Sequence, residues 1–393
     1  MKIVIVGGVA GGMSAATRLR RLSEDADITV VERSGYVSFA NCGLPYHVGG
    51  VIEDRSALLL QTPQSLAARF GIRVLVGHEV TSVDRGGRVV QVTGPDGEAS
   101  LDYDALVLSP GARPVRPPIP GIERALSLRD IEDTDAMVDA VSGDVGSVVV
   151  IGGGFIGIEL AENLRHRGLD VTIVEAADQV MAPLDPEMAA FVHQRLRESG
   201  VVLHLGAGVS AIGERDVTLA DGSTVPADIV VAAIGVRPDS TLATDAGLEV
   251  DERGGIVADE AMRTSDPAIY ALGGAVVKRD ARDRPAVRGL RTPAGSRRRE
   301  RPAHASAGRP SRQIHTPPAS HAGYYPGAAG LHLKLLVDPE TDAILGAQAL
   351  GEDGADKRID VIATAMAGGI TASRLADLEL AYAPAFGSAK DPV

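Results

Sequence analysis

The chain has 393 residues, 45% of them hydrophobic, and a formal net charge of −13. That length accommodates about two or three domains with substantial cores, whereas the acidic balance and an aromatic content of 3% argue against nucleic acid as the main partner. The single cysteine, Cys42, cannot form an internal disulfide and indicates a reducing compartment, and the apolar residues 3–6 are too few for a signal peptide or a membrane span, so we expect a cytoplasmic protein.

The chain opens with a predicted dinucleotide-binding unit. Residues 2–6 are typical of a buried parallel strand, a helix is predicted from Ser14 to Leu22, and a second strand at 28–32 ends in Glu32. Between the first strand and the helix lie small residues, namely Gly7, Gly8, Val9, Ala10, Gly11 and Gly12. Such a loop lets the backbone approach a pyrophosphate, while the carboxylate takes ribose hydroxyls. Val9 replaces the middle glycine of G-x-G-x-x-G, so a glycine-rich turn of another α/β protein is an alternative; Met13 stands where a phosphate-loop lysine would be, which argues against nucleoside triphosphate hydrolysis.

The next apolar segments predict strands that lead away from this unit and return to it. Residues 73–76, 79–83 and 88–92 alternate in polarity, which favours antiparallel strands joined by turns at 86–87 and 94–97. Residues 104–111 predict a buried strand that ends in a tight turn and rejoins the first sheet.

A second dinucleotide-binding unit follows, with all elements of the fingerprint in order. A strand is predicted at 147–151, a helix at 158–167 and a strand at 171–175, and a strand at 229–235 closes the domain. The loop is a full G-x-G-x-x-G, in which Gly152, Gly154 and Gly157 are the glycines. Glu175 occupies the ribose position, where a carboxylate repels a 2′-phosphate, so NADH is favoured over NADPH.

The lone thiol lies in the stretch Ser38-Phe39-Ala40-Asn41-Cys42-Gly43-Leu44-Pro45-Tyr46. One interpretation is a buried structural cysteine. The other is a redox thiol near the first nucleotide site, whose sulfur partner comes from outside the chain or which cycles through sulfenic acid. Pro45 suits the first turn of a helix, which would leave Cys42 near its positive end. Two nucleotide sites imply hydride transfer between a nicotinamide and a flavin, and a nearby cysteine is a natural relay for the electrons.

With these features the sequence resembles the pyridine nucleotide–disulfide oxidoreductases, most closely the single-cysteine branch that reduces coenzyme A disulfide. The stretch around Cys42 carries this resemblance, as do residues 320–327, 354–360 and 382–392. The resemblance implies an α/β fold with two Rossmann-like domains, one for FAD and one for NADH or NADPH, and a C-terminal α+β dimerisation domain that is shortened here. The implied domains are 1–110 with 245–276 for FAD, 111–244 for NAD(P), an aberrant segment at 277–319, and an incomplete dimerisation domain at 320–393.

The resemblance also implies an activity and its residues. Electrons would pass from NAD(P)H through flavin and Cys42 to coenzyme A disulfide or another low-molecular-weight disulfide, in a homodimer without nucleic acid, membrane or metal. Asn41, Tyr324 and Tyr382 would join Cys42 in catalysis, the two tyrosines coming from a partner subunit. Ser14, Arg18, Arg21, Ser38 and Lys390 would hold the substrate. Besides both glycine loops, Glu32 and Glu175, the implied cofactor contacts are Arg33, Val80, Ser109, Gly111, Ile156, Glu159, Gly235 and Gly273.

Two departures put this activity in question. Gly274 stands where the family places an aspartate that binds the flavin, and the loss of one such hydrogen bond costs ~1.5–3 kcal/mol of binding. The segment from Arg279 to Arg312 is rich in arginine and proline and shorter than in the family. Its composition is typical of disorder. The alternative is a basic arm that binds an anion or nucleic acid, and we hypothesise a frameshifted or deleted stretch.

Two other functions therefore stay open. One is an NADH oxidase or peroxidase in which Cys42 forms sulfenic acid. The relatives with that activity carry a histidine in the first loop, where this chain has Val9 and Ala10, so disulfide reduction is favoured. The other is a catalytically impaired, flavin-poor member of the family.

Overall fold

The computed structural model describes residues 1–278, 286–291, 295–296, 310–381, 383–387 and 391. The chain divides into two compact units, one made of Met1–Val145 and Val231–Arg282 and the other of Gly146–Val230 and Asp283–Val393. Among the helices in these described ranges, none combines the length and the apolar character that crossing a bilayer requires.

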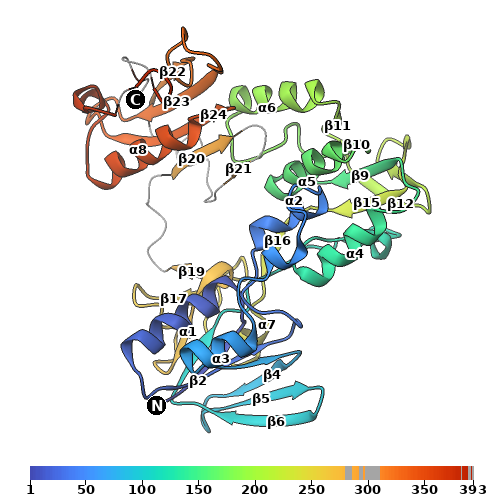
Figure 1. Cartoon of the computed structure of the whole chain (residues 1–393), viewed down its shortest axis with the longest axis vertical. Helices are drawn as coiled ribbons and strands as arrows, with labels where there is room; N and C mark the ends of the chain where they lie inside the picture. The colour runs from blue at the N-terminus through green and yellow to red at the C-terminus, as the bar shows by residue number, and fades with distance from the viewer. Residues whose placement is uncertain (279–285, 292–294, 297–309, 382, 388–390, 392–393) are drawn as a thin grey trace. The chain divides into compact units, whose positions relative to one another are not determined.

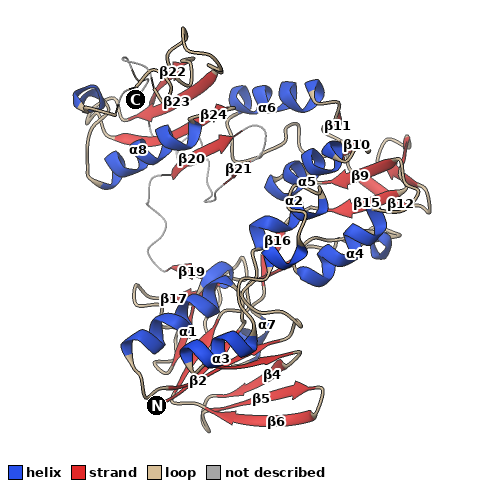
Figure 2. Ribbon diagram, in the orientation of Figure 1, coloured by secondary structure: helices blue, strands red, loops and turns tan. Residues whose placement is uncertain are grey.

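A five-stranded parallel sheet forms the centre of the first unit, in the order β18-β7-β1-β2-β3 (Figure 1). Its strands are β1 (Lys2–Val6), β2 (Asp27–Glu32), β3 (Arg73–Val76), β7 (Ala105–Leu108) and β18 (Ile269–Ala271). The unbroken β-branched runs of β1 and β2 are almost fully buried, as expected for strands covered on both faces. The helices α1 (Ala10–Leu22) and α3 (Pro63–Phe70) are drawn in front of these strands in Figure 2.

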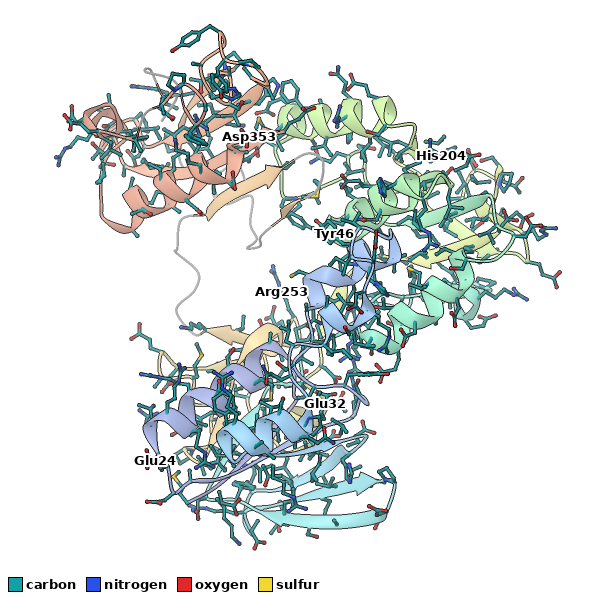
Figure 3. All side chains as sticks on the ribbon, viewed as in Figure 1. Glu24, Glu32, Tyr46, His204, Arg253 and Asp353 are labelled. Carbon is teal, nitrogen blue, oxygen red and sulfur yellow. The ribbon has the colours of Figure 1, made fainter. Side chains whose placement is uncertain are left out.

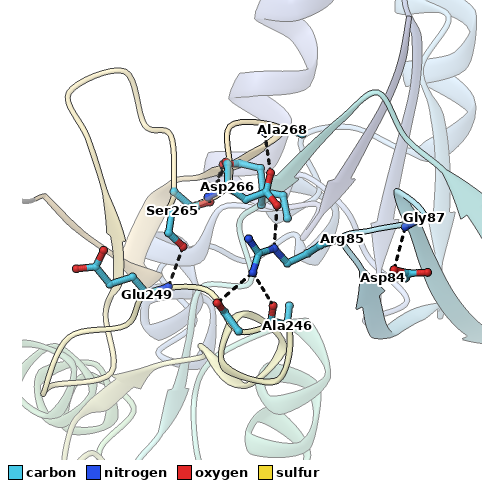
Figure 4. Close-up of polar contacts among 11 residues, drawn as sticks. Asp84, Arg85, Gly87, Ala246, Glu249, Ser265, Asp266 and Ala268 are labelled. Atoms are coloured by element: carbon cyan, nitrogen blue, oxygen red, sulfur yellow. Dashed lines mark hydrogen bonds and ion pairs between the residues drawn. The ribbon is translucent and has the colours of Figure 1, made fainter.

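An antiparallel sheet of β4 (Glu79–Asp84), β5 (Val89–Gly94) and β6 (Gly97–Asp102) branches from this unit. Arg85, just after β4, fastens it to the returning segment that leads into β18. The Arg85 guanidinium donates to Asp266 Oδ2 at 2.8 Å and to the carbonyls of Ala246 and Gly247, and Asp266 also accepts from the Ala268 N–H (Figure 4). Segments about 180 residues apart in the chain are thereby joined.

The first unit also contains two small sheets and three short helices. β8 (Ala112–Pro114) pairs with β16 (Val236–Pro238), and β17 (Ile256–Ala258) pairs with β19 (Val276–Lys278). The helices are α2 (Leu44–Val48), α4 (Ile131–Val141) and α7 (Thr241–Asp245). Asp130 caps α4 by accepting the Asp133 N–H at 2.9 Å.

A second nucleotide-type sheet has the order β11-β10-β9-β15, with β9 (Ser147–Ile151), β10 (Asp170–Val174), β11 (Val202–His204) and β15 (Ile229–Ala232). The second unit adds α5 (Phe155–His166), α6 (Pro186–Glu198) and a three-stranded sheet of β12 (Val209–Ile212), β13 (Asp216–Leu219) and β14 (Thr224–Pro226).

The C-terminal part of the second unit is a sheet with the order β21-β20-β24-β23-β22. Its strands are β20 (Ala286–Arg291), β21 (Gly295–Ser296), β22 (Arg312–Thr316), β23 (Leu331–Val337) and β24 (Ile344–Gly351). Leu331, Leu333, Leu335 and Val337 point to one face and form a core with α8 (Ala355–Ala367). Because side chains alternate along a strand, the residues between them point to the opposite face.

Most predicted elements are confirmed, with two corrections. Residues 73–76 are not part of the antiparallel sheet, because β3 pairs parallel to β2 in the main sheet. α1 begins at Ala10 and α5 at Phe155, both earlier than predicted. Within the predicted aberrant segment 277–319, the described residues include β20, β21 and β22, whereas residues 279–285, 292–294 and 297–309 lie outside the described part of the chain.

Candidate active site

The first glycine loop leaves β1 at a point where only glycine fits. Gly7 has a φ of +98°, and a Cβ on it would lie 2.1 Å from the Ser109 carbonyl oxygen. A Cβ on Gly12 would lie 1.8 Å from the Gly7 carbonyl oxygen. Gly11 lies against the side chains of Ser109 and Leu272. The structure therefore brings the predicted contacts Gly7–Gly12, Ser109 and Gly273 together at the carboxyl ends of β1, β7 and β18, the edge where such sheets bind nucleotides.

Glu32, at the end of β2, is bonded to this loop. Figure 3 labels Glu32 on the ribbon. Its carboxylate accepts the Gly8 N–H at 2.6 Å and the Ser34 N–H at 2.9 Å, and only 7% of the residue is exposed. Arg33, next in the chain, pairs with Asp239 at 3.3 Å. The other two predicted FAD contacts are Gly111 and Val80. Gly111 has a φ of +73° just before β8, whereas the Val80 side chain is buried in the hydrophobic core.

The second glycine loop repeats this construction. Gly152 has a φ of +108°, and the Glu175 carboxylate accepts the Gly153 N–H at 2.7 Å and the Ala177 N–H at 2.8 Å. A Cβ on Gly157 would lie 2.1 Å from the Gly152 carbonyl oxygen, whereas a Cβ on Gly154 would have no described protein atom within 4 Å. Gly154 therefore has a backbone that an outside group can approach closely, as a pyrophosphate requires.

The remaining predicted contacts of this nucleotide lie on α5 and after β15. Ile156 and Glu159 are partly exposed on α5. One turn beyond Glu159, burial and the neighbouring Glu159 carboxylate raise the pKa of Glu162 to about 7, which leaves it partly protonated at neutral pH. Gly235 has a φ of +128° and belongs to the other compact unit.

Cys42 is exposed and lies on a single 3-10 turn, Asn41–Gly43, directly before α2. As predicted, Pro45 lies in the first turn of α2. The Ser38 N–H donates to the Gly8 carbonyl of the first loop at 2.8 Å, and Ser38 itself has a φ of +50°. A strained backbone at a non-glycine residue persists where the surrounding contacts hold it.

Apolar packing reinforces this attachment. Phe39 and Leu44, on either side of Cys42, form a buried cluster with Leu58 and Ile131, and Val9 of the first glycine loop packs against it. The segment that carries the thiol is therefore fixed to the loop predicted to bind flavin. Because Cys42 itself is exposed, the interpretation as a buried structural residue is wrong.

Residue pattern places the predicted substrate contacts on one face of α1. Ser14, Arg18 and Arg21 are spaced by four and three positions and are all exposed. Asn41 donates to the Arg129 carbonyl at 3.4 Å. Arg129 was not singled out from the sequence: it is half-buried beside Arg33, and burial followed by that neighbouring charge lowers its pKa. No local signal in the sequence marks Arg129, and only the fold brings it near Glu32 and Asn41.

The C-terminal residues of the prediction are in part outside the described chain. Tyr324 is 76% exposed and belongs to the second unit, whereas Cys42 belongs to the first. Tyr382 and Lys390 lie outside the described residues. Among the residues that the structure describes, no group of three or more His, Cys, Asp or Glu side chains is arranged to hold a metal ion.

The chain has two glycine loops, and each lies at the edge of a parallel sheet and donates a hydrogen bond to a carboxylate. Together they define an oxidoreductase of the two-dinucleotide class. The comparisons identify the family: residues 1–308 match the pyridine nucleotide-disulphide oxidoreductase model and residues 305–391 match the dimerisation domain of the same family. The chain belongs to this family of flavoprotein enzymes, which use FAD and NAD(P)H, and the predicted fold class is confirmed.

Three similar proteins are a coenzyme A disulfide reductase, a CoADR-RHD protein and a persulfide reductase. A coenzyme A disulfide reductase of Staphylococcus aureus is 32% identical over 430 residues, which cover 99% of this chain and 97% of the relative. The solved structure of reduced Bacillus anthracis CoADR-RHD is 40% identical with a TM-score of 0.91, covering 100% of this chain and 78% of that one. The NAD-dependent persulfide reductase of A. fulgidus is 35% identical with a TM-score of 0.93, covering 100% and 81%. Because the 430-residue alignment is longer than this chain of 393 residues, the Staphylococcus aureus relative contains segments without a counterpart here.

Proposed function

We propose that this chain is an NADH-driven reductase of coenzyme A disulfide or a similar small disulfide, with FAD on the first glycine loop and NADH on the second. The observation that carries the proposal is the attachment of the Cys42 segment to the first loop, through the Ser38–Gly8 hydrogen bond and the apolar cluster around Phe39. An exposed thiol held beside a flavin loop suits a relay that meets substrate from solvent.

The residues present fit both nucleotides. Gly7 and Gly12 bring the backbone close to the sheet edge, Gly154 leaves room for a pyrophosphate, and Glu32 and Glu175 stand at the ribose positions. The carboxylate of Glu175, followed by Ala176 and Ala177, favours NADH over NADPH. FAD held by these residues would supply two-electron transfer between the nicotinamide and sulfur.

The chain's own part of the reaction takes place at Cys42. Its thiolate attacks one sulfur of the substrate disulfide; the substrate S–S bond breaks, one thiolate leaves, and a mixed disulfide with Cys42 forms. Two electrons that originate from NADH then break the mixed disulfide, which releases the second thiolate and regenerates Cys42. Asn41 would orient the thiol, and Ser14, Arg18 and Arg21 offer a polar and cationic face suited to the phosphates of coenzyme A.

The proposal includes the domain organisation. Residues 1–110 with 245–276 would bind FAD, 111–244 would bind NADH, and 320–393 would contribute to a homodimer in which Tyr324, Tyr382 and Lys390 approach the partner's Cys42. The similarity to a persulfide reductase makes persulfides a second substrate class for the same thiol.

The test uses the fact that Cys42 is the only cysteine. After incubation with coenzyme A disulfide, intact-protein mass spectrometry should show one coenzyme A adduct per wild-type chain and none on Cys42→Ser. The Cys42→Ser protein should keep its flavin reduction by NADH and lose disulfide turnover. Disulfide turnover that survives the substitution would refute the sulfur relay. Rapid NADH consumption with oxygen alone would indicate an NADH oxidase, and rapid consumption with a persulfide alone would indicate a persulfide reductase.

A further inference from the structure

A buried lysine joins the C-terminal sheet to the second nucleotide-binding region. Lys334 lies on β23 between core leucines but points to the opposite face, and its side chain is 2% exposed. Its ammonium group donates to the carboxylates of Asp185 and Glu187 at the start of α6. Although burial alone would lower the pKa of Lys334, these two carboxylates raise it, so the lysine is charged. A lysine this deeply buried is stable only when it is paired in this way.

The contacts around Lys334 extend along α6. Gln348, the cross-strand neighbour of Lys334 on β24, accepts the Asp185 N–H at 3.1 Å. Further along the helix, the ring of Phe191 stacks on His332 with centroids 3.7 Å apart. α6 therefore packs on the face of the C-terminal sheet opposite α8, and Lys334 and Gln348 hold its N-cap residue, Asp185.

The residues just before α6 are bonded to the second glycine loop. The Met181 N–H donates to the Gly153 carbonyl at 2.8 Å, and the Leu184 N–H donates to the Met181 carbonyl at 2.8 Å. Val180 fills the space beside Gly153, where a Cβ would lie 2.6 Å from Val180 Cγ1. Met181 has a φ of +52°. A left-handed backbone conformation is unfavourable for a residue other than glycine, so contacts at both ends must hold Met181 in it.

We infer that Lys334 is a positioning residue for the nicotinamide nucleotide: through Asp185 it holds residues 180–185, and these hold the second glycine loop in the shape that binds NADH. The inference rests on the proposed function of that loop. It means that the dimerisation region contributes to a nucleotide site although none of its described residues belongs to the glycine fingerprint.

The test compares Lys334→Met with a matched change on the other side of the same sheet. Arg358 on α8 is equally buried, at 1% exposed, and pairs with Asp391 at 2.9 Å, so Arg358→Met also removes a buried cation but leaves α6 untouched. Losing the charge-assisted contacts to Asp185 and Glu187 should raise the Kd for NADH about tenfold in Lys334→Met. Maximal flavin reduction at saturating NADH and the FAD content should stay near wild type. Hydrogen exchange should rise in residues 152–157 and 180–185 in Lys334→Met and not in Arg358→Met.

Unchanged NADH affinity and unchanged exchange in both segments would overturn the inference, even if Lys334→Met lowers the unfolding temperature. If Lys334→Met does not fold, Gln348→Leu decides, because it removes only the acceptor of the Asp185 N–H; a smaller change in the same direction is expected, and no change refutes the idea. A wild-type protein that does not bind NADH would refute the proposed function, while the exchange comparison would still decide the role of Lys334.

Discussion

The difference between Gly154 and Gly157 yields a sharp prediction about the second loop. Gly154 has a φ of −79° and a ψ of −174°, which alanine adopts freely, and a Cβ there would meet no described protein atom within 4 Å. Gly154→Ala should therefore leave the unfolding temperature unchanged or slightly higher. The added methyl group should keep the pyrophosphate from the backbone, and the loss of a hydrogen bond to a charged group, about 1.5–3 kcal/mol, raises the Kd for NADH ~10- to 100-fold.

Isothermal titration calorimetry with NADH and thermal unfolding of the same preparations measure both quantities. Gly157→Ala is the matched control, since its Cβ would lie 2.1 Å from the Gly152 carbonyl oxygen, and it should lower both stability and affinity. FAD content should not change in Gly154→Ala because the first loop is a separate element. NADH affinity equal to wild type in Gly154→Ala would refute the placement of the pyrophosphate at this loop.

Three more variants test other parts of the molecule. Gly274→Asp should raise the FAD retained per purified chain, measured from the flavin absorbance, because a Cβ at Gly274 would have no described neighbour within 4 Å and the carboxylate restores a family contact. Arg85→Met should destabilise the protein by ~1–3 kcal/mol in urea unfolding, because it leaves the Asp266 carboxylate without its cation. Burial raises the pKa of Asp266, but the Arg85 hydrogen bond and nearby charges lower it below 3.8. The stability that the Arg85–Asp266 pair contributes is therefore present above pH 4 and disappears as the pH falls through the folded-state pKa of Asp266. Ala176→Arg with Glu175→Ala should shift kcat/KM from NADH toward NADPH.

For each of these three variants, one result would contradict the prediction. FAD content that does not rise in Gly274→Asp would mean that the missing carboxylate is not what limits flavin binding. A stability difference between wild type and Arg85→Met that persists unchanged at pH 3 would show that the ion pair is not its source. An unaltered preference for NADH in the double variant would exclude Glu175 from the ribose site.

The sequence predicted the sheets better than the helix ends or the long-range polar contacts. Unbroken apolar runs that lead into glycine-containing turns identified β1, β7 and β9, because strands buried on both faces need a continuous apolar composition. α1 was predicted to begin too late since Gly11 and Gly12 disfavour a helix in isolation, yet their close approach to Ser109 and Gly7 requires glycine. The direction of β3 depends on its partner, which alternation does not reveal.

The parts of the candidate site that lie in short sequence motifs could be predicted. The parts that the fold brings together from distant positions in the chain could not. Both glycine loops, their carboxylates and Cys42 are visible in short motifs. Lys334 was missed because its partner Asp185 is 149 residues away. The only local sign was a charged residue within the apolar strand Leu331–Val337, which a search for buried lysines would have found.

The hydrogen bonds between a carboxylate and each glycine loop have a consequence for how the protein acquires its nucleotides. Glu32 and Glu175 each bind an N–H of their own glycine loop and a second N–H two residues beyond themselves. Both cradles are thus preorganised by the polypeptide, so a nucleotide that arrives does not have to bear the entropy of ordering them. We therefore expect the apoprotein to fold with both glycine loops in place and to bind its two nucleotides afterwards.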